Sequence, residues 1–307
     1  MPSESKTSQL TELVALSPAH GTASKATPHH HIYFAALVVA SLVAAWPAIA
    51  RLVNLALADD RYSHTALIPL MAAALAYLDK PNWLPHARLA PAYGLGLVLP
   101  GLVLHFTAPT WTIPTTTLSA QVTGIVLTWL GAFLLCYGPA ALKAAAFPAG
   151  FLFLTIPLPE PVVDQISYAL QAASAEISHL LFQILGVPVF RQGHVFTLPG
   201  LVIEVAEQCS GIRSTTALII SSMLVGYVFL RSAWRRLALV LATAFVAVLK
   251  NAIRIVFLSA MSVYVDESFL TGFLHHHYGG TVFSLLGLAL LAPIFLVLRK
   301  NDKLVGS

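Results

Sequence analysis

Residues 201–222 read LVIEVAEQCSGIRSTTALIISS and divide into two parts of different character. The first part is a short apolar run with two carboxylates that ends in Cys209, and a Ser-Gly pair then opens a long apolar helix. Cysteine occurs only at Cys136 and Cys209, and Cys209 lies where a polar segment meets an apolar one rather than inside an apolar run. This position makes Cys209 a candidate nucleophile at the edge of a membrane span.

The composition of the whole chain is that of a membrane protein. Of the 307 residues, 57% are hydrophobic and 10% are charged. A large soluble core does not explain the uncharged runs at residues 32–50 and 118–137, which approach the roughly 20 residues that a helix needs to cross a bilayer. The net charge is +4, with no basic face interleaved with aromatic residues. The lipid bilayer is therefore a predicted partner, and nucleic acid is not.

The apolar runs predict an all-α integral membrane protein with about eight transmembrane helices. The predicted spans are residues 32–52, 66–78, 92–106, 118–137, 140–156, 211–230, 237–263 and 278–298. Residues 32–300 then form one multispan membrane catalytic domain. Residues 1–31, rich in Ser, Thr, Pro and His, are expected to be a disordered cytoplasmic tail, and residues 301–307 a second cytoplasmic tail.

The segment between the fifth and sixth spans has a different pattern. Three prolines within residues 157–161 end the preceding helix. Apolar side chains recur every three or four positions in residues 161–185, which predicts an amphipathic helix lying on the membrane surface. Residues 195–198 and 201–205, separated by a Pro-Gly pair, predict a small β-hairpin. Both elements are expected on the outer face, before the sixth span.

The basic residues are unevenly distributed between the two sides of these spans. With a cytoplasmic N-terminus, Arg51, Arg61 and Arg191 fall outside. The cytoplasmic set is Lys6, Lys25, Lys80, Arg88, Lys143, Arg231, Arg235, Arg236, Arg299, Lys300 and Lys303. Basic residues favour the cytoplasmic side, so the bias predicts a multi-pass protein of the inner (cytoplasmic) membrane whose Cys209 faces the periplasm or exterior.

Charged residues inside spans are costly, and they mark functional sites by default. Arg213 follows Cys209 by four residues, on the same face if that turn is helical. Lys250 and Arg254 share a face of the seventh span, with Asn251 alongside. Arg254 lies about 17 residues, or roughly 25 Å, from the cytoplasmic end of that span. The topology therefore places Cys209 and Arg254 at one depth.

A histidine cluster completes a possible catalytic set. His275, His276 and His277 lie in a loop that is also predicted to be outside. A thiolate at the first turn of a helix is stabilised by the positive helix end and by nearby cations, an arginine stabilises an oxyanion, and a histidine moves the proton to a leaving amine. These are the parts of acyl transfer through a thioester. Each residue also has a structural interpretation: Cys209 as a small packing residue, Arg254 as a structural cation and the histidines as an interfacial polar cluster.

Two other sites are less compatible with the pattern. A zinc site could use the histidines with Asp266, Glu267 or Cys209, but adjacent histidines point in different directions on a helix and no HExxH spacing exists, so no metal or other cofactor is expected. A transporter could use Lys250 and Arg254 to bind anions. No inverted repeat or pair of broken spans supports it.

At these residues the chain resembles the exosortase/archaeosortase family of multispan cysteine transpeptidases. Four segments carry the resemblance: residues 207–214 (EQCSGIRS) for the cysteine motif, 251–254 (NAIR) for the arginine motif, His275 with Gly279 and Phe283 for the histidine motif, and 62–69 (YSHTALIP) for the N-terminal signature. Thr65 stands in that signature where glycine is expected.

The resemblance implies roles for individual residues. Cys209 is expected to be the nucleophile, Arg254 its electrostatic partner and His275 the acid/base, with His276 or His277 as alternatives because the triple makes the register ambiguous. Arg213 and Asn251 are expected to support them. The implied partners are exported proteins with a C-terminal sorting signal of the Pro-Glu-Pro kind, and an unidentified acceptor nucleophile.

Two alternative functions remain at this stage. A membrane cysteine protease would hydrolyse its substrate rather than transfer it. A non-enzymatic transporter or polysaccharide-assembly protein would need Arg254 but not Cys209.

Overall fold

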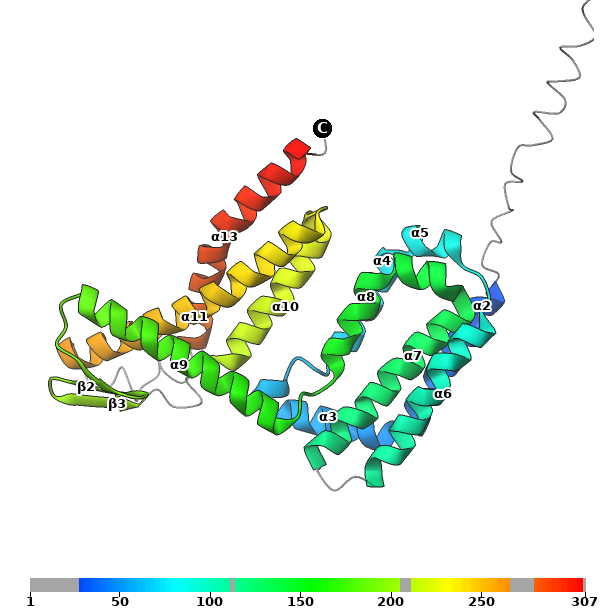
Figure 1. The fold of residues 1–307 in the computed structure, drawn as a ribbon, viewed down its shortest axis with the longest axis horizontal. Helices are drawn as coiled ribbons and strands as arrows, with labels where there is room; N and C mark the ends of the chain where they lie inside the picture. The colour runs from blue at the N-terminus through cyan, green and yellow to red at the C-terminus, as the bar shows by residue number, and fades with distance from the viewer. Residues whose placement is uncertain (1–27, 111–113, 205–210, 266–278, 306–307) are drawn as a thin grey trace, which may run out of the picture.

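The computed structural model of the chain describes residues 28–110, 114–204, 211–265 and 279–305. Within these residues the fold is almost wholly helical, with one small sheet (Figure 1). Helices α2 to α8 form one group, and α10, α11 and α13 form a second, with α9 running along the lower edge of the second group in this view. The prediction of an all-α membrane protein is confirmed at this level.

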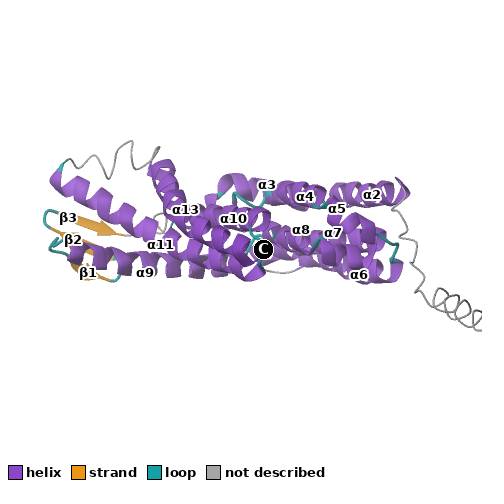
Figure 2. Ribbon diagram, turned by 90° about the horizontal axis from the view of Figure 1, so that it is seen from above, coloured by secondary structure: helices purple, strands orange, loops and turns teal. Residues whose placement is uncertain are grey.

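The elements of the first group come from the N-terminal half of the chain. They are α2 (Pro28–Ala44), α3 (Trp46–Ala58), the 3-10 turn η1 (Asp60–Tyr62), α4 (Ile68–Leu78), α5 (Lys80–Trp83), η2 (Leu84–His86), α6 (Pro91–Thr107), η3 (Ala108–Thr110), α7 (Pro114–Ala144), α8 (Ala146–Phe151) and η4 (Leu152–Thr155). Seen from above, α2, α3 and α4 lie in one layer, and α6, α7 and α8 lie against it (Figure 2).

The remaining elements follow after the proline-rich break. They are α9 (Glu160–Ile184), β1 (Phe190–Gln192), β2 (Val195–Leu198), β3 (Leu201–Glu204), α10 (Ile212–Phe229), α11 (Ala233–Tyr264) and α13 (Gly279–Val305). Helix α13 thus continues through residues 301–305, for which a tail is expected from the sequence. Helix α2 likewise begins four residues before the predicted start of the first span.

The described residues contain fewer candidate spans than the predicted eight. Five helices, in α6, α7, α10, α11 and α13, are long and apolar enough to cross a membrane. Two more candidates are bent pairs, α2 with α3 at 74° and α8 with α9 at 97°, so the total is five to seven. Predicted spans 66–78 and 140–156 do not form long helices. Helix α4 has only 11 residues, and α8 has only six before a 3-10 turn; 11 residues rise about 16 Å, about half of the hydrocarbon core.

The breaks have identifiable causes in the sequence. Pro47 stands in the first turn of α3 and has no backbone N–H to continue the hydrogen bonding of α2. The chain therefore bends at Ala45, between α2 and α3. In α7, Gly138 has φ 79° and precedes Pro139, so the helix is kinked there. Hydropathy does not register the bend before Pro47, which is why residues 32–52 are predicted as one span.

Helices α6 and α7 pack with their backbones close together. A Cβ atom on Gly124 would lie 2.5 Å from the carbonyl oxygen of Gly101, and one on Gly101 would lie 2.8 Å from that of Gly124. Small residues permit such contacts between membrane helices. Gly94 of α6 also lies against α7, at Leu135, whereas Gly96 faces open space.

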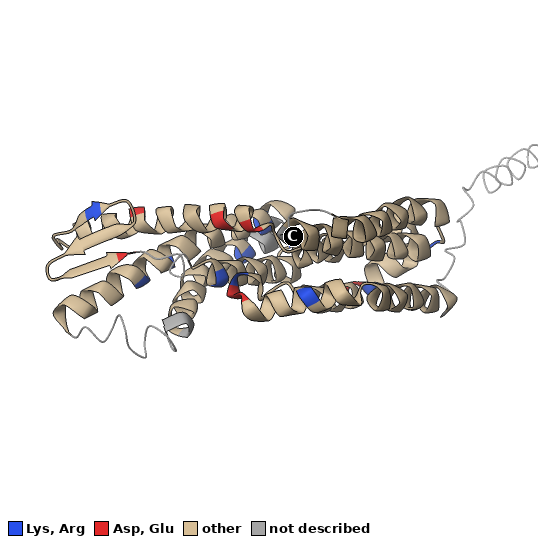
Figure 3. Cartoon of the chain, turned by 90° about the horizontal axis from the view of Figure 1, so that it is seen from below, with Lys and Arg blue, Asp and Glu red and all other residues tan. Residues whose placement is uncertain are grey.

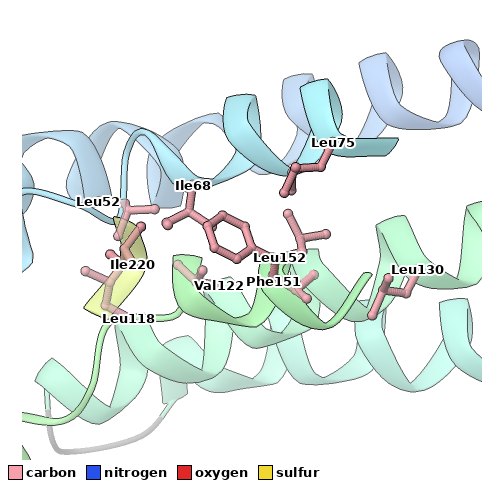
Figure 4. Close-up of a cluster of buried hydrophobic side chains, with 11 residues drawn as sticks. Leu52, Ile68, Leu75, Leu118, Val122, Leu130, Phe151, Leu152 and Ile220 are labelled. Carbon is pink, nitrogen blue, oxygen red and sulfur yellow. The ribbon is translucent and has the colours of Figure 1, made fainter. Parts of the chain in front are cut away.

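One apolar core joins the two groups of helices. Leu52 and Ile68 from the first layer meet Val122 and Phe151 from the second, and Ile220 of α10 enters the same cluster (Figure 4). Because side chains from α3, α4, α7, α8 and α10 share this buried surface, α10 is held against the N-terminal helices. The start of α10, which contains the end of the cysteine motif, is thereby positioned.

A three-stranded antiparallel sheet in the order β1-β2-β3 lies beside α9. Strands β2 and β3 pair from Val195 with Glu204 to Leu198 with Leu201, where the hairpin is expected, and β1 adds a strand that the sequence pattern does not indicate. Phe196 is fully buried, in a cluster with Phe182 of α9 and residues of α11. The sheet is therefore fixed to both helices rather than extending freely.

Helix α9 packs on the rest of the protein through a face of mostly small side chains. Of the apolar series that predicts a membrane-surface helix, Ile166, Leu180 and Ile184 are all exposed. The buried face instead carries Val163, Ser167, Ser174, Ala175, Ser178 and Phe182. Small side chains let α9 approach α11 closely, and the apolar series is left for the membrane.

Candidate active site

The described part of the cysteine motif begins at Gly211, which caps the N-terminus of α10. Gly211 has φ 70°, a left-handed conformation that glycine adopts without steric cost. Cys209 lies outside the described residues, as do His275, His276 and His277. The structure therefore places the second half of the cysteine motif and the whole arginine motif.

Lys250 of α11 lies against the first turn of α10. Its side chain is 3% exposed, and its Nζ donates a hydrogen bond of 2.7 Å to Oγ of Ser214. Ser214 Oγ in turn donates to the carbonyl oxygen of Gly211 at 3.0 Å. A cation inside a membrane span is stable only where polar groups replace its water. The ammonium of Lys250 obtains one such group from the residue that follows Arg213.

Asn251 connects the same turn to α9. A Cβ atom on Gly211 would lie 3.2 Å from Oδ1 of Asn251, so the glycine backbone and this amide are in close proximity. The Nδ2 of Asn251 donates to Oγ of Ser174 at 3.0 Å, and Asn251 is 3% exposed. One residue further, Ser178 Oγ donates to the carbonyl of Ala252 at 3.4 Å. The arginine motif thus holds α9 and α10 together.

Arg254 lies one turn beyond Lys250, towards the C-terminal end of α11. It is half-buried, and the described residues provide its guanidinium with no hydrogen-bond or ion-pair partner. A residue at position i+4 of a helix lies on the same face, so Arg254 and Lys250 point to the same side of α11. That side is the one that faces the start of α10.

Arg213 has a different environment from that expected of a residue beside the thiol. Its Nη1 forms an ion pair of 2.7 Å with Oδ2 of Asp60 in η1, and both side chains are largely exposed. Ser214, the next residue, turns instead towards Lys250. Arg213 therefore joins α10 to η1, just before the N-terminal signature, rather than to the arginine motif.

The residues around η1 make further contacts across the fold. Arg61 pairs with Asp59 at 2.8 Å and with Asp164 of α9 at 3.0 Å, and the hydroxyl of Tyr62 donates to the carbonyl of Leu158 at 3.1 Å. Figure 3 shows long stretches of helix without charge and a cluster of both signs near the middle of the molecule. The segment from Asp59 to Tyr62, which contains η1, thus contacts both α9 and α10.

The environment of η1 changes the acidity of three groups. Burial raises the pKa of the Asp59 carboxyl, but the side-chain and backbone hydrogen bonds from Arg61 and its charge outweigh burial and hold that pKa below its usual value. Burial raises the pKa of Tyr62, and burial lowers the pKa of His64. At neutral pH, Asp59 is therefore ionised and His64 is uncharged.

Sequence reasoning missed several of these residues. It assigns no contact to the segment Asp59–Tyr62, and it gives no role to Ser174 or Ser214. A signal for the α9 contact exists: Ser167, Ser174 and Ser178 are spaced by seven and four residues, a stripe of small polar side chains typical of close contact between membrane helices.

No metal centre is formed by the part of the chain that the structure describes. Among those residues, no group of three His, Cys, Asp or Glu side chains is placed to hold an ion. The zinc alternative depends on Cys209 and residues 266–277, which lie outside them.

Comparison with known proteins was made at the level of families, curated proteins and solved structures. The family model described as transmembrane exosortase matches residues 56–292, which is more than half of the chain and includes all four motifs. No curated protein and no solved structure matches. From the extent of this match, the chain belongs to the transmembrane exosortase family.

Proposed function

We propose that this exosortase is a membrane-embedded cysteine transpeptidase that cleaves the C-terminal sorting signals of exported proteins. The observation that carries the proposal is the contact between two motifs: Ser214 of the cysteine motif accepts a hydrogen bond from Lys250, next to the arginine motif, and Asn251 lies against Gly211. Cys209 is two residues before Gly211 in the chain, and we propose that it acts at this turn. Family membership supports the same function.

The chemistry follows from the charges gathered at this turn. The positive end of α10 and the cations of Lys250 and Arg254 favour the thiolate of Cys209 over the thiol. The thiolate attacks the scissile carbonyl, and Arg254 stabilises the resulting oxyanion. His275, or His276 or His277, gives a proton to the leaving amine as the C–N bond breaks and a thioester remains. An acceptor nucleophile then attacks the thioester and regenerates the thiolate.

The arrangement of the ends of the helices supports an outward-facing site. In Figure 1 the α10–α11 connection and the C-terminal end of α13 lie at the same end of the molecule, opposite the sheet and the start of α10. The first end carries Arg231, Arg235, Arg236 and Arg299, and basic residues favour the cytoplasmic side. The candidate site and the sheet then face the periplasm, in the inner membrane.

A substrate of the expected kind fits this geometry. Its own transmembrane helix, held in the bilayer by a basic C-terminal cluster, would bring a Pro-Glu-Pro type motif to the outer boundary of the lipid. Helix α9 contacts α10, and the sheet packs on α9 and α11, so we propose that α9 and the sheet shape the side on which this motif arrives.

The test is processing of a tagged, signal-bearing substrate that is co-expressed with the enzyme. We expect complete loss of processing for Cys209→Ala and Arg254→Ala, and at most slight processing for Cys209→Ser. Lys143→Gln, an exposed change on α7, is the matched control and should process normally. Full processing by Cys209→Ala would refute the nucleophile assignment.

Two further results separate the alternatives. The mass of the released product distinguishes transfer from hydrolysis, because transfer adds the acceptor and hydrolysis adds water. Single replacement of His275, His276 and His277 identifies the acid/base. A transporter or polysaccharide-assembly protein would need Arg254 but tolerate loss of Cys209, so equal phenotypes of the two variants argue for the enzyme.

A further inference from the structure

A cavity of about 520 Å³ lies between α2, α4, α5, α7 and α8, in the first group of helices. Its walls are almost entirely apolar, with Phe34 and Leu42 of α2 facing Leu130 and Phe133 of α7. Neither the cysteine motif nor the arginine motif contributes to its lining. It is therefore separate from the candidate active site, and its occupant does not depend on the proposed function.

The two basic side chains that line this cavity lie near each other. They are His31 and Lys80, and Nδ1 of His31 lies 2.7 Å from the hydroxyl of Tyr137, which also lines the cavity. Trp83 packs on Tyr137 with ring centroids 5.0 Å apart. Aromatic and basic side chains of this kind are enriched at the depth of lipid headgroups. The cavity thus has a polar part and a long apolar interior.

Lys80 has a charge that the described protein does not neutralise. No acidic side chain of the described residues forms an ion pair with it. The neighbouring carboxylate of Asp79 instead accepts hydrogen bonds from Tyr227 and Asn82. A half-buried ammonium beside an apolar cavity is complementary to an anionic headgroup whose hydrocarbon chain occupies that cavity.

The cavity is long enough for an extended acyl chain and opens sideways. Its lining runs from His31 to Leu42 of α2, over which the helix rises about 16 Å. An extended hydrocarbon chain is far thinner than an α-helix with its side chains, which is about 10–12 Å across. The lining side chains Leu70 and Tyr77 are 69% and 73% exposed, so the cavity opens towards the bilayer. A lipid can therefore enter sideways.

We propose that this cavity binds one anionic phospholipid, with an acyl chain along α2 and the headgroup phosphate against Lys80 and His31. The ligand fills a space between the two layers of the first group that protein side chains leave open. Leu130 and Leu152 line the cavity and also belong to the core around Ile68, so the lipid continues that core towards the membrane boundary.

The test uses the full-length protein, purified in detergent and analysed by native mass spectrometry. Phosphatidylglycerol and phosphatidylcholine with identical acyl chains are titrated separately. We expect a one-lipid adduct that is retained more strongly for phosphatidylglycerol. One basic residue near a membrane surface contributes about 1 kcal/mol, so Lys80→Gln should reduce retention of phosphatidylglycerol about five-fold and leave phosphatidylcholine unchanged. Lys143→Gln, an exposed change outside the cavity, should match the wild type.

A second pair of variants tests the apolar part of the site. Ala73→Trp places a large ring where Ala73 lines the cavity, and it should reduce retention of both lipids; Leu99→Trp, on the exposed face of α6, should not. Equal retention of the two lipids by the wild type, or equal behaviour of Lys80→Gln and Lys143→Gln, would overturn the proposal. If Ala73→Trp does not fold, the comparison of Lys80→Gln with Lys143→Gln tests the proposal by itself. Displacement of phosphatidylglycerol by a synthetic sorting-signal helix would instead assign the cavity to substrate.

Discussion

Lys250 illustrates how a single charge is accommodated inside this fold. It is almost fully buried in α11, yet the only hydrogen bond of its ammonium within the described residues is the one to Ser214. A hydroxyl that solvates a buried charge contributes more to stability than one that bonds only to its own helix.

The contact between Lys250 and Ser214 can be tested by stability. Ser214→Ala leaves the buried ammonium without its acceptor, so we expect a loss of about 1–3 kcal/mol in the free energy of unfolding, measured by thermal denaturation in detergent. Ser222→Ala is the matched control, because that buried serine of α10 donates only to the carbonyl of Ile219, within its own helix. It should cost less.

A double mutant separates this interaction from general packing. In a Lys250→Met background the buried charge is gone, and Ser214→Ala should then cost clearly less than in the wild type. Equal costs in the two backgrounds would show that Ser214 stabilises α10 without the help of Lys250.

Asp59 gives a prediction for the dependence of stability on pH. Its folded-state pKa is lowered, so its contribution to stability is present above the unfolded pKa of about 4 and is lost as the pH falls through the lower folded value. Asp59→Asn keeps the oxygen that accepts from the Arg61 amide but removes the titration. Between about pH 5 and pH 3, the melting temperature of the wild type should fall more than that of Asp59→Asn. Parallel profiles would exclude this contribution.

At the scale of elements, the pairing of α6 with α7 depends on two facing glycines. Gly124→Ala places a methyl group 2.5 Å from a backbone oxygen of Gly101, which cannot move as a side chain does. We expect a loss of about 1–3 kcal/mol, measured by unfolding in detergent. Gly96→Ala on the same helix pair meets open space and should be neutral or slightly stabilising. Comparable destabilisation by both changes would place the cause in helix flexibility rather than in contact.

Helix α9 shows why the contact face of a helix is hard to assign in a membrane protein. In water, the apolar face of an amphipathic helix is the buried one. In a bilayer the lipid is itself apolar, and burial favours small residues and hydrogen bonds such as that between Ser174 and Asn251. The periodicity of apolar residues in α9 therefore identifies its membrane-facing side.

At the scale of the whole molecule, α10 connects the two groups of helices at both of its ends. Arg213 pairs with Asp60 at its start. Near its end, Tyr227 stacks on Phe147 of α8 at 3.8 Å and donates to Asp79. The apolar core around Ile220 lies between these contacts. Motifs from distant parts of the chain are thereby held in one arrangement.

The proposed orientation of the molecule is open to a direct test. Single cysteines are introduced at Ser232, between α10 and α11, at Asn82 on α5, and at Gln192 in the sheet, in a background without Cys136 and Cys209. In intact cells with a permeable outer membrane, an impermeant maleimide should label only the cysteine at position 192. All three should react after lysis. Labelling of position 232 in intact cells would reverse the orientation and place the candidate site inside.

Much of this protein is determined by local properties of its sequence. Long uncharged runs must lie in lipid or in a core, so the membrane class and most of the helices follow from hydropathy alone. Residues 207–214 and 251–254 likewise carry the identity of the family in short, contiguous motifs. These features need no knowledge of which segments meet.

Other features were decided only by the tertiary structure. Asp60 and Arg213 are 153 residues apart, and Ser214 and Lys250 are 36 apart, so their contacts depend on the path of the whole chain. The number of spans changed because α4 and α8 are too short to cross a bilayer and because the chain bends at Ala45, just before Pro47. The physical reason is the same in each case: hydropathy fixes where a segment is stable, but pairwise contacts and backbone geometry fix which neighbours it has there.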